Sequence, residues 1–546
     1  MPPQLQEKEV GNDIHQETYE GEELEQIVTV YDDNFHGLHL STALVFLALC
    51  ICYVVQIYIL VVGGVFARTV AAAVGAPSYK GVWLGQSISI VTASLGPPCC
   101  RAADLWGRKW PIVGSSIFGF IGGIIVARAN SMSQVIAGQT IMSIFFGAQP
   151  LLHAVASEIL PRKWRPSAQG LLYVSASIGG IVAFLGGQTL VDDGPDGWRN
   201  VWYTAAAMLG ASGVIIAVLY RPLPLPLQKS LTVKQKLGRF DWTGIVLFAA
   251  AMTLIAMGLS WAEAPFPWSD AHVIACLVVG VVLAIALIVH QTLFEKHGLF
   301  DHDLFKKDFT FAIAAFGSFL DGVIFWAYNA YTPFQASIIW PTGDAITEGA
   351  RNCMIFFTAI IFSALISIMG RFTKSIRVPI VISFLIFILF FGLMSGIGLH
   401  DFNASWGYLV ILGSGFGWSL PFIMTVAQLL TPAHLITTTS AILLSVRSLG
   451  SSTGLGIYNA IFNSLLNDKL VSNIAPAVVP LGLPPSSLEA FIGGLAGNSP
   501  PAAIAAIPGV TPEIIGVGIT ALKTAYMQSF KRVYVAAAVL SAVGAI

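Results

Sequence analysis

Long runs of apolar residues, separated by short polar stretches, dominate the chain after its first forty residues. A helix needs about twenty apolar residues to cross the roughly 30 Å of hydrocarbon in a bilayer. Counting runs of that length predicts about fourteen membrane-spanning helices. The last run is short, so the chain either ends inside its final helix or lacks its natural C-terminus. The predicted spans are 41–65, 81–99, 110–128, 134–156, 166–190, 200–219, 242–261, 271–291, 309–328, 351–369, 378–398, 405–427, 437–461 and 532–546.

Composition supports lipid as the solvent of this chain. Of its residues, 55% are hydrophobic and only 10% are charged, whereas soluble domains carry about a quarter charged residues. The formal net charge of -1 argues against a nucleic-acid partner, which would require a concentrated basic face. No P-loop sequence occurs, so we do not expect ATP to drive the protein. The fold class we predict is an all-α membrane protein.

The six cysteines fall in or beside apolar runs, which indicates small buried side chains rather than disulfides or metal ligands. We therefore expect neither a metal site nor a cofactor. These cysteines are Cys50, Cys52, Cys99, Cys100, Cys276 and Cys353.

Residues 1–40 are polar and acidic, which predicts a disordered tail. No cleavable signal peptide precedes the first apolar run, so that run is expected to act as the targeting signal. Loops on the cytoplasmic side of membrane proteins carry an excess of lysine and arginine. With a cytoplasmic N-terminus, the inner loops collect most of these residues, and the short outer loops hold only Arg68, Lys80, Arg128 and Arg199. We therefore expect the N-terminus to be cytoplasmic.

The spans repeat an internal plan. A tight basic turn lies between spans two and three, and a second one, Gly370–Lys374, lies eight spans later. This spacing predicts two related six-helix halves, a common plan in transporters. We assign 41–220 to the first half, 221–308 to a cytoplasmic linker with two extra helices, and 309–546 to the second half. The Pro- and Gly-rich segment 463–531 is expected to form a long external loop.

Several motifs carry a family resemblance. The turn Asp104-Leu105-Trp106-Gly107-Arg108-Lys109 resembles the signature loop of the major facilitator superfamily. The sequences Gly197-Trp198-Arg199 and Phe240-Asp241-Trp242-Thr243-Gly244 resemble its fourteen-span drug:proton antiporter branch. More specific are Trp261-Ala262-Glu263, Pro267-Trp268-Ser269-Asp270-Ala271-His272, Leu481-Gly482-Leu483-Pro484-Pro485 and Pro508-Gly509-Val510-Thr511. Together they are similar to the fungal trichothecene efflux pump family, which borders the fungal siderophore-iron transporters.

The chain departs from the resembled motifs at a few positions. Cys100 stands where the signature loop usually has glycine, and Leu105 stands where it has a basic residue. Gln139 replaces the arginine that often follows Ile-x-Gly in span four, and Val182-Ala183 replaces the Gly-Pro of the span-five motif. These departures bear on proton coupling and not on the fold.

The resemblance also implies a cytoplasmic gate, because the aspartate and arginine of the signature loop clip the two halves together in that superfamily. Gly107 would allow the sharp turn of this loop. Glu158, at the exit of span four, is expected to pair with Arg162 or Arg165 at the same face. The gate candidates are Asp104, Gly107, Arg108, Lys109, Glu158 and Arg162.

Two charged residues fall deep inside predicted spans. Asp321 lies roughly 18 Å into span nine and Arg447 roughly 15 Å into span thirteen, at 1.5 Å per residue. Charges inside a bilayer are costly and commonly functional. Because the two spans are neighbours in the resembled fold, we predict that Asp321 and Arg447 pair near the midplane. Proton arrival at Asp321 would then release Arg447, and the alternative is a static pair that only stabilises the bundle.

Other polar and aromatic residues inside the spans are candidates for a central cavity, which would suit a bulky amphipathic ligand. For each aromatic residue the alternative is ordinary packing. For His153 the alternative is a hydrogen bond to a neighbouring helix. Gly450, Gly454 and Gly456 are expected to allow close helix contact. The cavity candidates are Gln139, Gln149, His153, Trp326, Tyr328, Asn329 and Trp418, together with Gln56 and Tyr58 in span one.

These observations predict a transporter of the major facilitator type that works by alternating access. The predicted activity is proton-coupled efflux of a hydrophobic secondary metabolite, toxin or drug. Uptake of ferric siderophores is the main alternative. A transporter-like nutrient sensor is less favoured, because such sensors commonly carry large cytoplasmic extensions and this chain has only its acidic tail. An enzyme is not favoured, because the sequence has neither an H-E-x-x-H site nor paired intramembrane aspartates.

The expected partners are a small-molecule substrate, protons and the lipid bilayer, without nucleic acid or an obligate protein partner. The expected location is the plasma membrane of a fungus.

Overall fold

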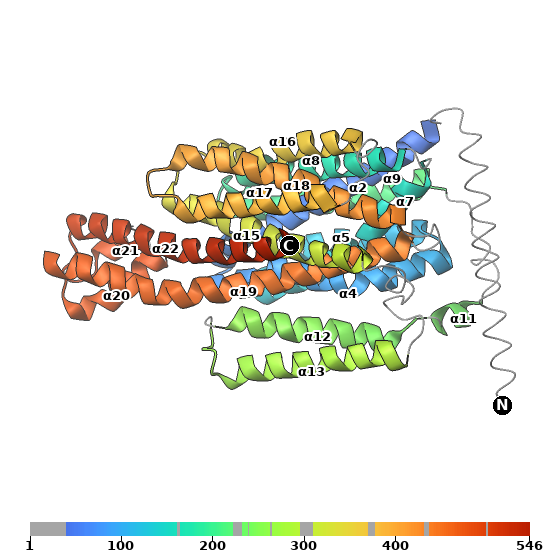
Figure 1. The fold of residues 1–546 in the computed structure, drawn as a ribbon. Coiled ribbons are helices and arrows are strands. Elements are labelled where there is room, and N and C mark those ends of the chain that lie inside the picture. The colour runs from blue at the N-terminus through green and yellow to red at the C-terminus, as the bar shows by residue number, and fades with distance from the viewer. Residues whose placement is uncertain are drawn as a thin grey trace.

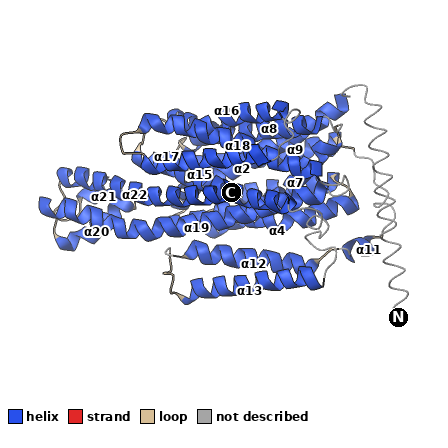
Figure 2. Ribbon diagram, in the orientation of Figure 1, coloured by secondary structure: helices blue, strands red, loops and turns tan. Residues whose placement is uncertain are grey.

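The computed structural model of this chain describes residues 40–160, 164–221, 232–238, 240–262, 265–294, 310–369, 377–430, 436–497 and 501–545. Within those ranges the regular elements are helices, apart from one isolated bridge between Ala262 and Phe266 (Figure 2). The all-α prediction is confirmed.

The first half holds six long helical segments. Its fourth segment is broken into α6, η2 and α7, with Pro150 at the start of α7. The elements are α2 (Leu40–Val65), α3 (Ala67–Ala73), η1 (Ser78–Gly81), α4 (Val82–Trp106), α5 (Lys109–Ala127), α6 (Met132–Ser143), η2 (Ile144–Ala148), α7 (Gln149–Glu158), α8 (Arg165–Val191) and α9 (Gly197–Leu219).

The second half also holds six long helices. In the sequence, a hairpin of two more helices separates the halves, and in space it lies along one side of the bundle (Figure 1). The short α11 (Val233–Gly238) precedes this hairpin, which consists of α12 (Trp242–Trp261) and α13 (Ala271–Leu293). The elements of the second half are α15 (Thr310–Ile339), α16 (Ala345–Met369), α17 (Arg377–Gly396), α18 (Phe402–Leu430), α19 (Ile436–Val478), η5 (Val479–Leu481), α20 (Pro485–Ala496), α21 (Pro501–Ala505) and α22 (Pro512–Ala545).

Each predicted span overlaps one of these long segments over most of its length. Among the described residues, 11 segments are long and apolar enough to cross a membrane. The other three, α4, α19 and α22, are long enough to cross a membrane but carry more polar residues. A bundle of about fourteen helices is therefore consistent with the structure.

The 463–531 segment differs from the expected loop, because most of its described residues are helical. Helix α19 continues to Val478, and α22 begins at Pro512. The reason is an apolar stripe at every fourth position of α19, which packs against α20 and α22 and favours a helix despite the Pro and Gly residues. The stripe consists of Phe462, Leu466, Leu470, Ile474 and Val478, all buried.

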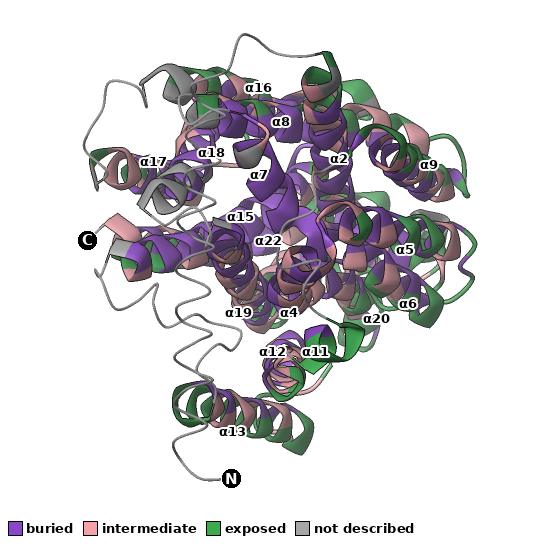
Figure 3. Cartoon of the chain, turned by 90° about the vertical axis from the view of Figure 1, so that its right-hand side faces the viewer, coloured by how far each residue is buried: buried purple, intermediate pink, exposed green. Residues whose placement is uncertain are grey.

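The bundle has two distinct ends, named here by the elements that mark them. At one end α4 turns into α5 through Gly107, and we call it the Gly107 end. At the opposite end α19 and α22 extend beyond the other helices and carry α20 and α21, and we call it the α20 end (Figure 1). The halves meet where α2, α4 and α8 pack against α15, α16 and α19. Viewed along the bundle, buried residues line the inside and exposed ones the outside (Figure 3).

The hairpin lies outside this bundle, with α12 against α4 and α19, and α13 on the outer side of α12 (Figure 3). Most of the exposed residues of α13 are apolar, among them Val278, Val282 and Ile285. An apolar outer face is what a lipid-facing helix requires. Asp241 joins the two helices at the end opposite their connecting turn. Its carboxylate accepts the Gly244 N–H of α12 at 2.7 Å and lies 3.0 Å from Nε2 of His290 in α13.

Candidate functional site: the cavity between the halves

Helices α15 and α19 approach unusually closely because glycines line their contact. A Cβ added at Gly322 would overlap the carbonyl oxygen of Arg447, and one at Gly450 would overlap that of Phe319. A Cβ at Gly454 would lie 2.9 Å from Cα of Val323. Small residues permit such backbone contact between membrane helices. The expected close contact of the α19 glycines is confirmed, with Gly456 fitting against Leu259 of α12 instead of α15.

This close approach places Asp321 of α15 directly beside Arg447 of α19. Arg447 Nε donates to Asp321 Oδ2 at 2.8 Å, and the Ser419 hydroxyl of α18 donates to Oδ1 at 2.6 Å. The Asp321 side chain is 0% exposed and that of Arg447 is 13% exposed. The predicted pairing is confirmed. Each carboxylate oxygen has a donor, which is what a buried ion pair needs to offset the loss of water.

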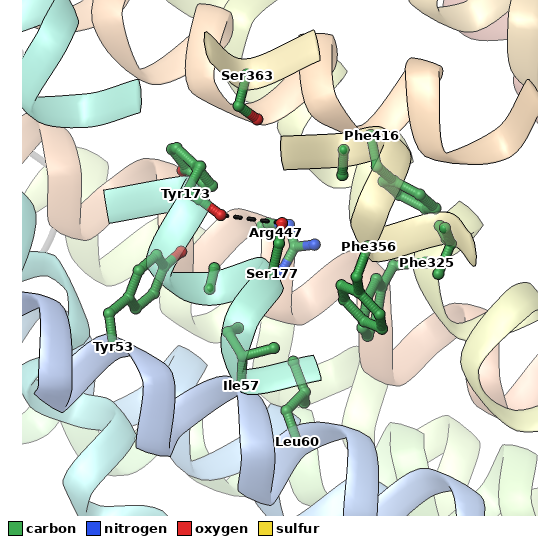
Figure 4. Close-up of a pocket in the computed structure, with 13 residues that line it drawn as sticks. Tyr53, Ile57, Leu60, Tyr173, Ser177, Phe325, Phe356, Ser363, Phe416 and Arg447 are labelled. Atoms are coloured by element: carbon green, nitrogen blue, oxygen red, sulfur yellow. Dashed lines mark hydrogen bonds between the residues drawn. The ribbon is translucent and has the colours of Figure 1, made fainter. Parts of the chain in front are cut away.

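Arg447 faces a cavity between the two halves, which we call the aromatic chamber. Its guanidinium lies 5.2 Å from the ring centroid of Phe325, within the range of a cation–π contact. Figure 4 shows Tyr53 and Tyr173 on one side of Arg447 and Phe356 and Phe416 on the other. The chamber is lined by Tyr53, Ile57, Leu60, Tyr173, Ala176, Ser177, Phe325, Ile355, Phe356, Ala359, Ser363, Phe416 and Arg447.

A smaller cavity adjoins the aromatic chamber and is more polar, so we call it the polar chamber. The two chambers share Leu60, Phe325 and Arg447. The ion pair is therefore located where an apolar cavity and a polar one meet. The polar chamber is lined by Leu60, Ile88, Ser89, Thr92, Phe146, Gln149, Phe325, Trp326, Arg447, Ser448 and Ser451.

Of the predicted cavity residues, Gln149 and Trp326 line the polar chamber. Gln149 Nε2 also lies 3.5 Å from the Tyr53 hydroxyl. Tyr328 points away from both chambers, because its hydroxyl donates to the Asn352 carbonyl of α16 at 3.2 Å. Asn329 Nδ2 lies 3.5 Å from the Leu60 carbonyl, so it joins α15 to α2 rather than lining a chamber.

His153 is fully buried beside the chamber wall. Its Nδ1 lies 2.7 Å from Gln169 Oε1 of α8, which is the expected bond to a neighbouring helix. Its ring centroid lies 5.1 Å from that of Tyr53 and 5.5 Å from that of Tyr173. Both tyrosines line the aromatic chamber, so His153 supports the wall from behind.

Gln139 and Trp418 lie outside the linings of both chambers. Gln139 is fully buried against Gly63 of α2, and neither amide atom has a hydrogen-bond partner among the described residues. Trp418 packs edge-on against Phe362, with ring centroids 5.9 Å apart. In the structure both are packing residues.

At the Gly107 end, the signature loop contacts the second half through Arg108. Gly107 has φ of 93°, a left-handed conformation that explains the glycine. Arg108 Nη2 lies 4.0 Å from Asp104 and donates to the Thr437 hydroxyl of α19 at 3.1 Å. The aspartate is thus positioned to hold the arginine that bridges the halves.

The other three gate candidates make no contact with the second half that the structure describes. Lys109 lies 5.7 Å from the ring of Trp110 in its own helix. Arg162 lies outside the described residues, and so does the side chain of Glu158, the last residue of α7.

At the α20 end, the halves are closed by contacts that the sequence did not predict. The guanidinium of Arg68 in α3 lies 3.2 Å above the ring of Phe334 in α15 and 5.7 Å from that of Phe462 in α19. A Cβ added at Gly85 of α4 would overlap the indole of Trp326. Helices α2, α3 and α4 are therefore in tight contact with α15 and α19 at this end.

The main lining residues that sequence reasoning missed are Tyr53, Tyr173, Phe356 and Phe416. A usable signal existed for Tyr53, because Tyr53, Ile57 and Leu60 recur at helical spacing and share one face of α2. The residues predicted in that helix were instead Gln56 and Tyr58. Both point elsewhere, since Gln56 donates to the Phe145 carbonyl and Tyr58 to the Val201 carbonyl.

Replacing Asp104 with alanine is expected to open the Gly107 end more often, because Arg108 would lose the carboxylate that holds it toward Thr437. A cysteine at position 445 reports on this, since Ser445 is buried opposite Gly96 across the two halves. We expect faster labelling of Ser445→Cys in the Asp104→Ala background. An unchanged labelling rate counts against a gating role for Asp104.

Comparison with known proteins places the chain among transporters. The family model described as fungal trichothecene efflux pump matches residues 40–546. The trichothecene efflux pump TRI12 of Fusarium sporotrichioides is 24% identical over 466 residues, covering 82% of this chain and 75% of the relative. The MFS-type efflux transporter ffsH of Aspergillus flavipes is 26% identical over 406 residues, covering 72% and 69%.

Solved structures show the same architecture. A bacterial homolog of the human lysosomal transporter Spinster, crystallised in an inward-facing and occupied conformation, superposes with a TM-score of 0.60 at 15% identity. The match covers 93% of this chain and 96% of that one. At this identity the likeness establishes the fold alone, which is the predicted major facilitator fold of two six-helix halves, here with two additional helices.

Proposed function

Because the chain belongs to the fungal trichothecene efflux pump family, we propose that it exports a bulky, mostly apolar small molecule by alternating access. Its family and fold are those of multi-pass membrane transporters. The observation that carries the proposal is the aromatic chamber, which lies between the two halves and not within either one. A site at the interface of two related halves can be opened to each side of the membrane in turn.

The lining of the aromatic chamber supports an apolar cargo with few polar groups. Three phenylalanine rings and several aliphatic side chains provide most of the surface. Tyr173 and Tyr53 line the chamber side by side, with ring centroids 5.8 Å apart, and their hydroxyls are the groups expected to bind a cargo oxygen. Burial of apolar area stabilises such a complex by about 25 cal/mol per Å², and a few hydrogen bonds orient the cargo.

We further propose that export is coupled to protons through Asp321. Protonation of Asp321 removes the charge that holds Arg447, which lines both chambers. Arg447 can then turn toward the cargo or toward Ser448 and Ser451 in the polar chamber. The departures at Gln139 and Leu105 from the antiporter motifs make Asp321 the main candidate for the coupling group, because its carboxylate binds Arg447, which lines both chambers.

The proposed location is the plasma membrane with a cytoplasmic N-terminus. The distribution of lysine and arginine supports this orientation. It makes the Gly107 end cytoplasmic and the α20 end external, so the tight contacts at the α20 end would belong to an inward-facing or occluded state. No obligate protein partner is part of the proposal.

Expression in a yeast that lacks its own drug pumps and siderophore uptake tests the function. We expect resistance to apolar fungal toxins, lower accumulation of a labelled toxin, and no rescue of growth on low iron. The Asp321→Asn variant serves as the inactive control. Rescue of iron-limited growth by a ferric siderophore, without toxin resistance, contradicts the proposal. Neither the Fusarium nor the Aspergillus relative is described as a siderophore transporter, so that alternative lacks support.

A further inference from the structure

Helix α12, the first of the two extra helices, takes part in a buried polar joint with both halves, located toward the α20 end. Gln86 lies one turn into α4, and its amide exchanges hydrogen bonds with Ser452 of α19. Gln86 Nε2 donates to the Ser452 carbonyl at 3.1 Å, and the Ser452 hydroxyl donates to Gln86 Oε1 at 2.6 Å. This pair links the first half directly to the second.

Ser260 of α12 also takes part in this hydrogen-bond network. Gln86 Nε2 also donates to the Ser260 hydroxyl at 3.1 Å, and Asn459 Nδ2 of α19 donates to the Ser260 carbonyl at 3.2 Å. One residue of α12 therefore accepts hydrogen bonds from both halves. The four side chains are 0% to 6% exposed. Losing partners there is costly, because water cannot replace them while the joint is closed.

Apolar contacts keep α12 in place on both sides of the joint. Met252 and Ala256 of α12 are buried in one cluster with Ile90 and Ala93 of α4. On the other side, Leu259 fits so closely against Gly456 of α19 that a Cβ added to this glycine would lie 2.6 Å from the Leu259 Cβ. The hairpin thus spans the seam between α4 and α19 instead of packing on one half.

We propose that α12 is a working part of the gate at the α20 end, with Ser260 as the residue that holds α4 and α19 together when this end is closed. The proposal rests on alternating access, in which α4 and α19 must separate when the α20 end opens. That separation breaks the hydrogen bonds between Gln86 and Ser452. It also breaks the bond of Ser260 either to Gln86 or to Asn459. The strength of the bonds made by Ser260 therefore affects how often this end opens.

Labelling of a buried reporter cysteine tests this without any cargo. Leu455 of α19 is 4% exposed and faces Gly85 of α4, so Leu455→Cys reports on the seam. Ser260→Ala removes the hydroxyl that Gln86 uses and leaves the carbonyl that Asn459 uses. We expect a membrane-impermeant maleimide to label the reporter about fivefold faster in this variant, the effect of one buried hydrogen bond.

Matched variants decide the outcome. Thr253→Ala removes a hydroxyl that donates to the Ala249 carbonyl within α12 and to no other helix among the described residues, so it should leave labelling unchanged. Ser260→Thr keeps the acceptor and should behave as the parent. Gln86→Leu should increase labelling, and adding Ser260→Ala to it should change little, because the two share one bond.

The proposal is overturned if Gln86→Leu increases labelling and Ser260→Ala does not, since α12 would then be passive. It is also overturned if neither variant changes the rate. If Ser260→Ala does not fold, Asn459→Leu breaks the bond to α12 from the other half and carries the same expectation. If the labelling rates follow the expected pattern but the parent protein exports no toxin, the proposed cargo is wrong and the gate proposal stands.

Discussion

We expect Asp321→Asn to abolish export and to lower the thermal stability of the purified protein. The substitution leaves the Arg447 guanidinium in a low-dielectric site without the carboxylate that accepts from it at 2.8 Å. Breaking one side of a buried ion pair costs about 3–5 kcal/mol, because the remaining charge is uncompensated. Thermal unfolding in detergent measures the loss of stability, and toxin accumulation in cells measures the loss of export.

Two further variants separate coupling from simple stabilisation. Asp468→Asn neutralises an exposed carboxylate on α19 and should change neither stability nor export. The exchanged pair Asp321→Arg with Arg447→Asp restores the counter-charge but moves the carboxylate to the other helix. If the exchanged protein exports with the pH dependence of the parent, Asp321 is a structural residue and the coupling proposal is wrong.

We expect Gly322→Ala to reduce both stability and export, although it adds only one methyl group. Its Cβ would overlap the carbonyl oxygen of Arg447, and a backbone atom cannot move aside as a flexible side chain can. We expect a loss of about 1–3 kcal/mol in stability from overpacking. Export should fall as well, because separating α15 from α19 lengthens the bond between Asp321 and Arg447.

The control for this substitution lies on the same helix. At Gly317 of α15 an added Cβ would meet nothing closer than Ile423 Cδ1 at 3.7 Å, an ordinary contact. Gly317→Ala should therefore keep stability and export close to those of the parent. If Gly322→Ala and Gly317→Ala have the same stability and export, the close approach of α15 and α19 is not required for either property.

Sequence reasoning succeeded where one helix, or one pair of helices, was enough. Asp321 and Arg447 could be paired because both are charged, both fall inside apolar runs and both lie at similar depth. It failed for Tyr53 and Arg68, because the role of each side chain depends on which helix of the other half lies opposite it. Arg68 was assigned to an outer loop, and only the fold brings it over Phe334 in the other half.

The 463–531 segment shows the same limit from another direction. Its Pro and Gly content indicated a loop, since those residues weaken helices in isolation. The apolar stripe that continues α19 was visible in the sequence, yet it becomes decisive only when α22 lies beside it. Tertiary burial then outweighs propensity, and the helix continues to Val478.

Hydropathy, charge placement and the family resemblance of the motifs were sufficient to predict a multi-pass helical transporter with two halves and an intramembrane ion pair. The solvent explains why: twenty consecutive apolar residues have few alternatives to a spanning helix, and a charge among them stands out. The chamber walls, the closure at the α20 end and the joint at Ser260 depended on the folded molecule. They arise where side chains from helices distant in sequence meet, and neither hydropathy nor spacing records which helices become neighbours.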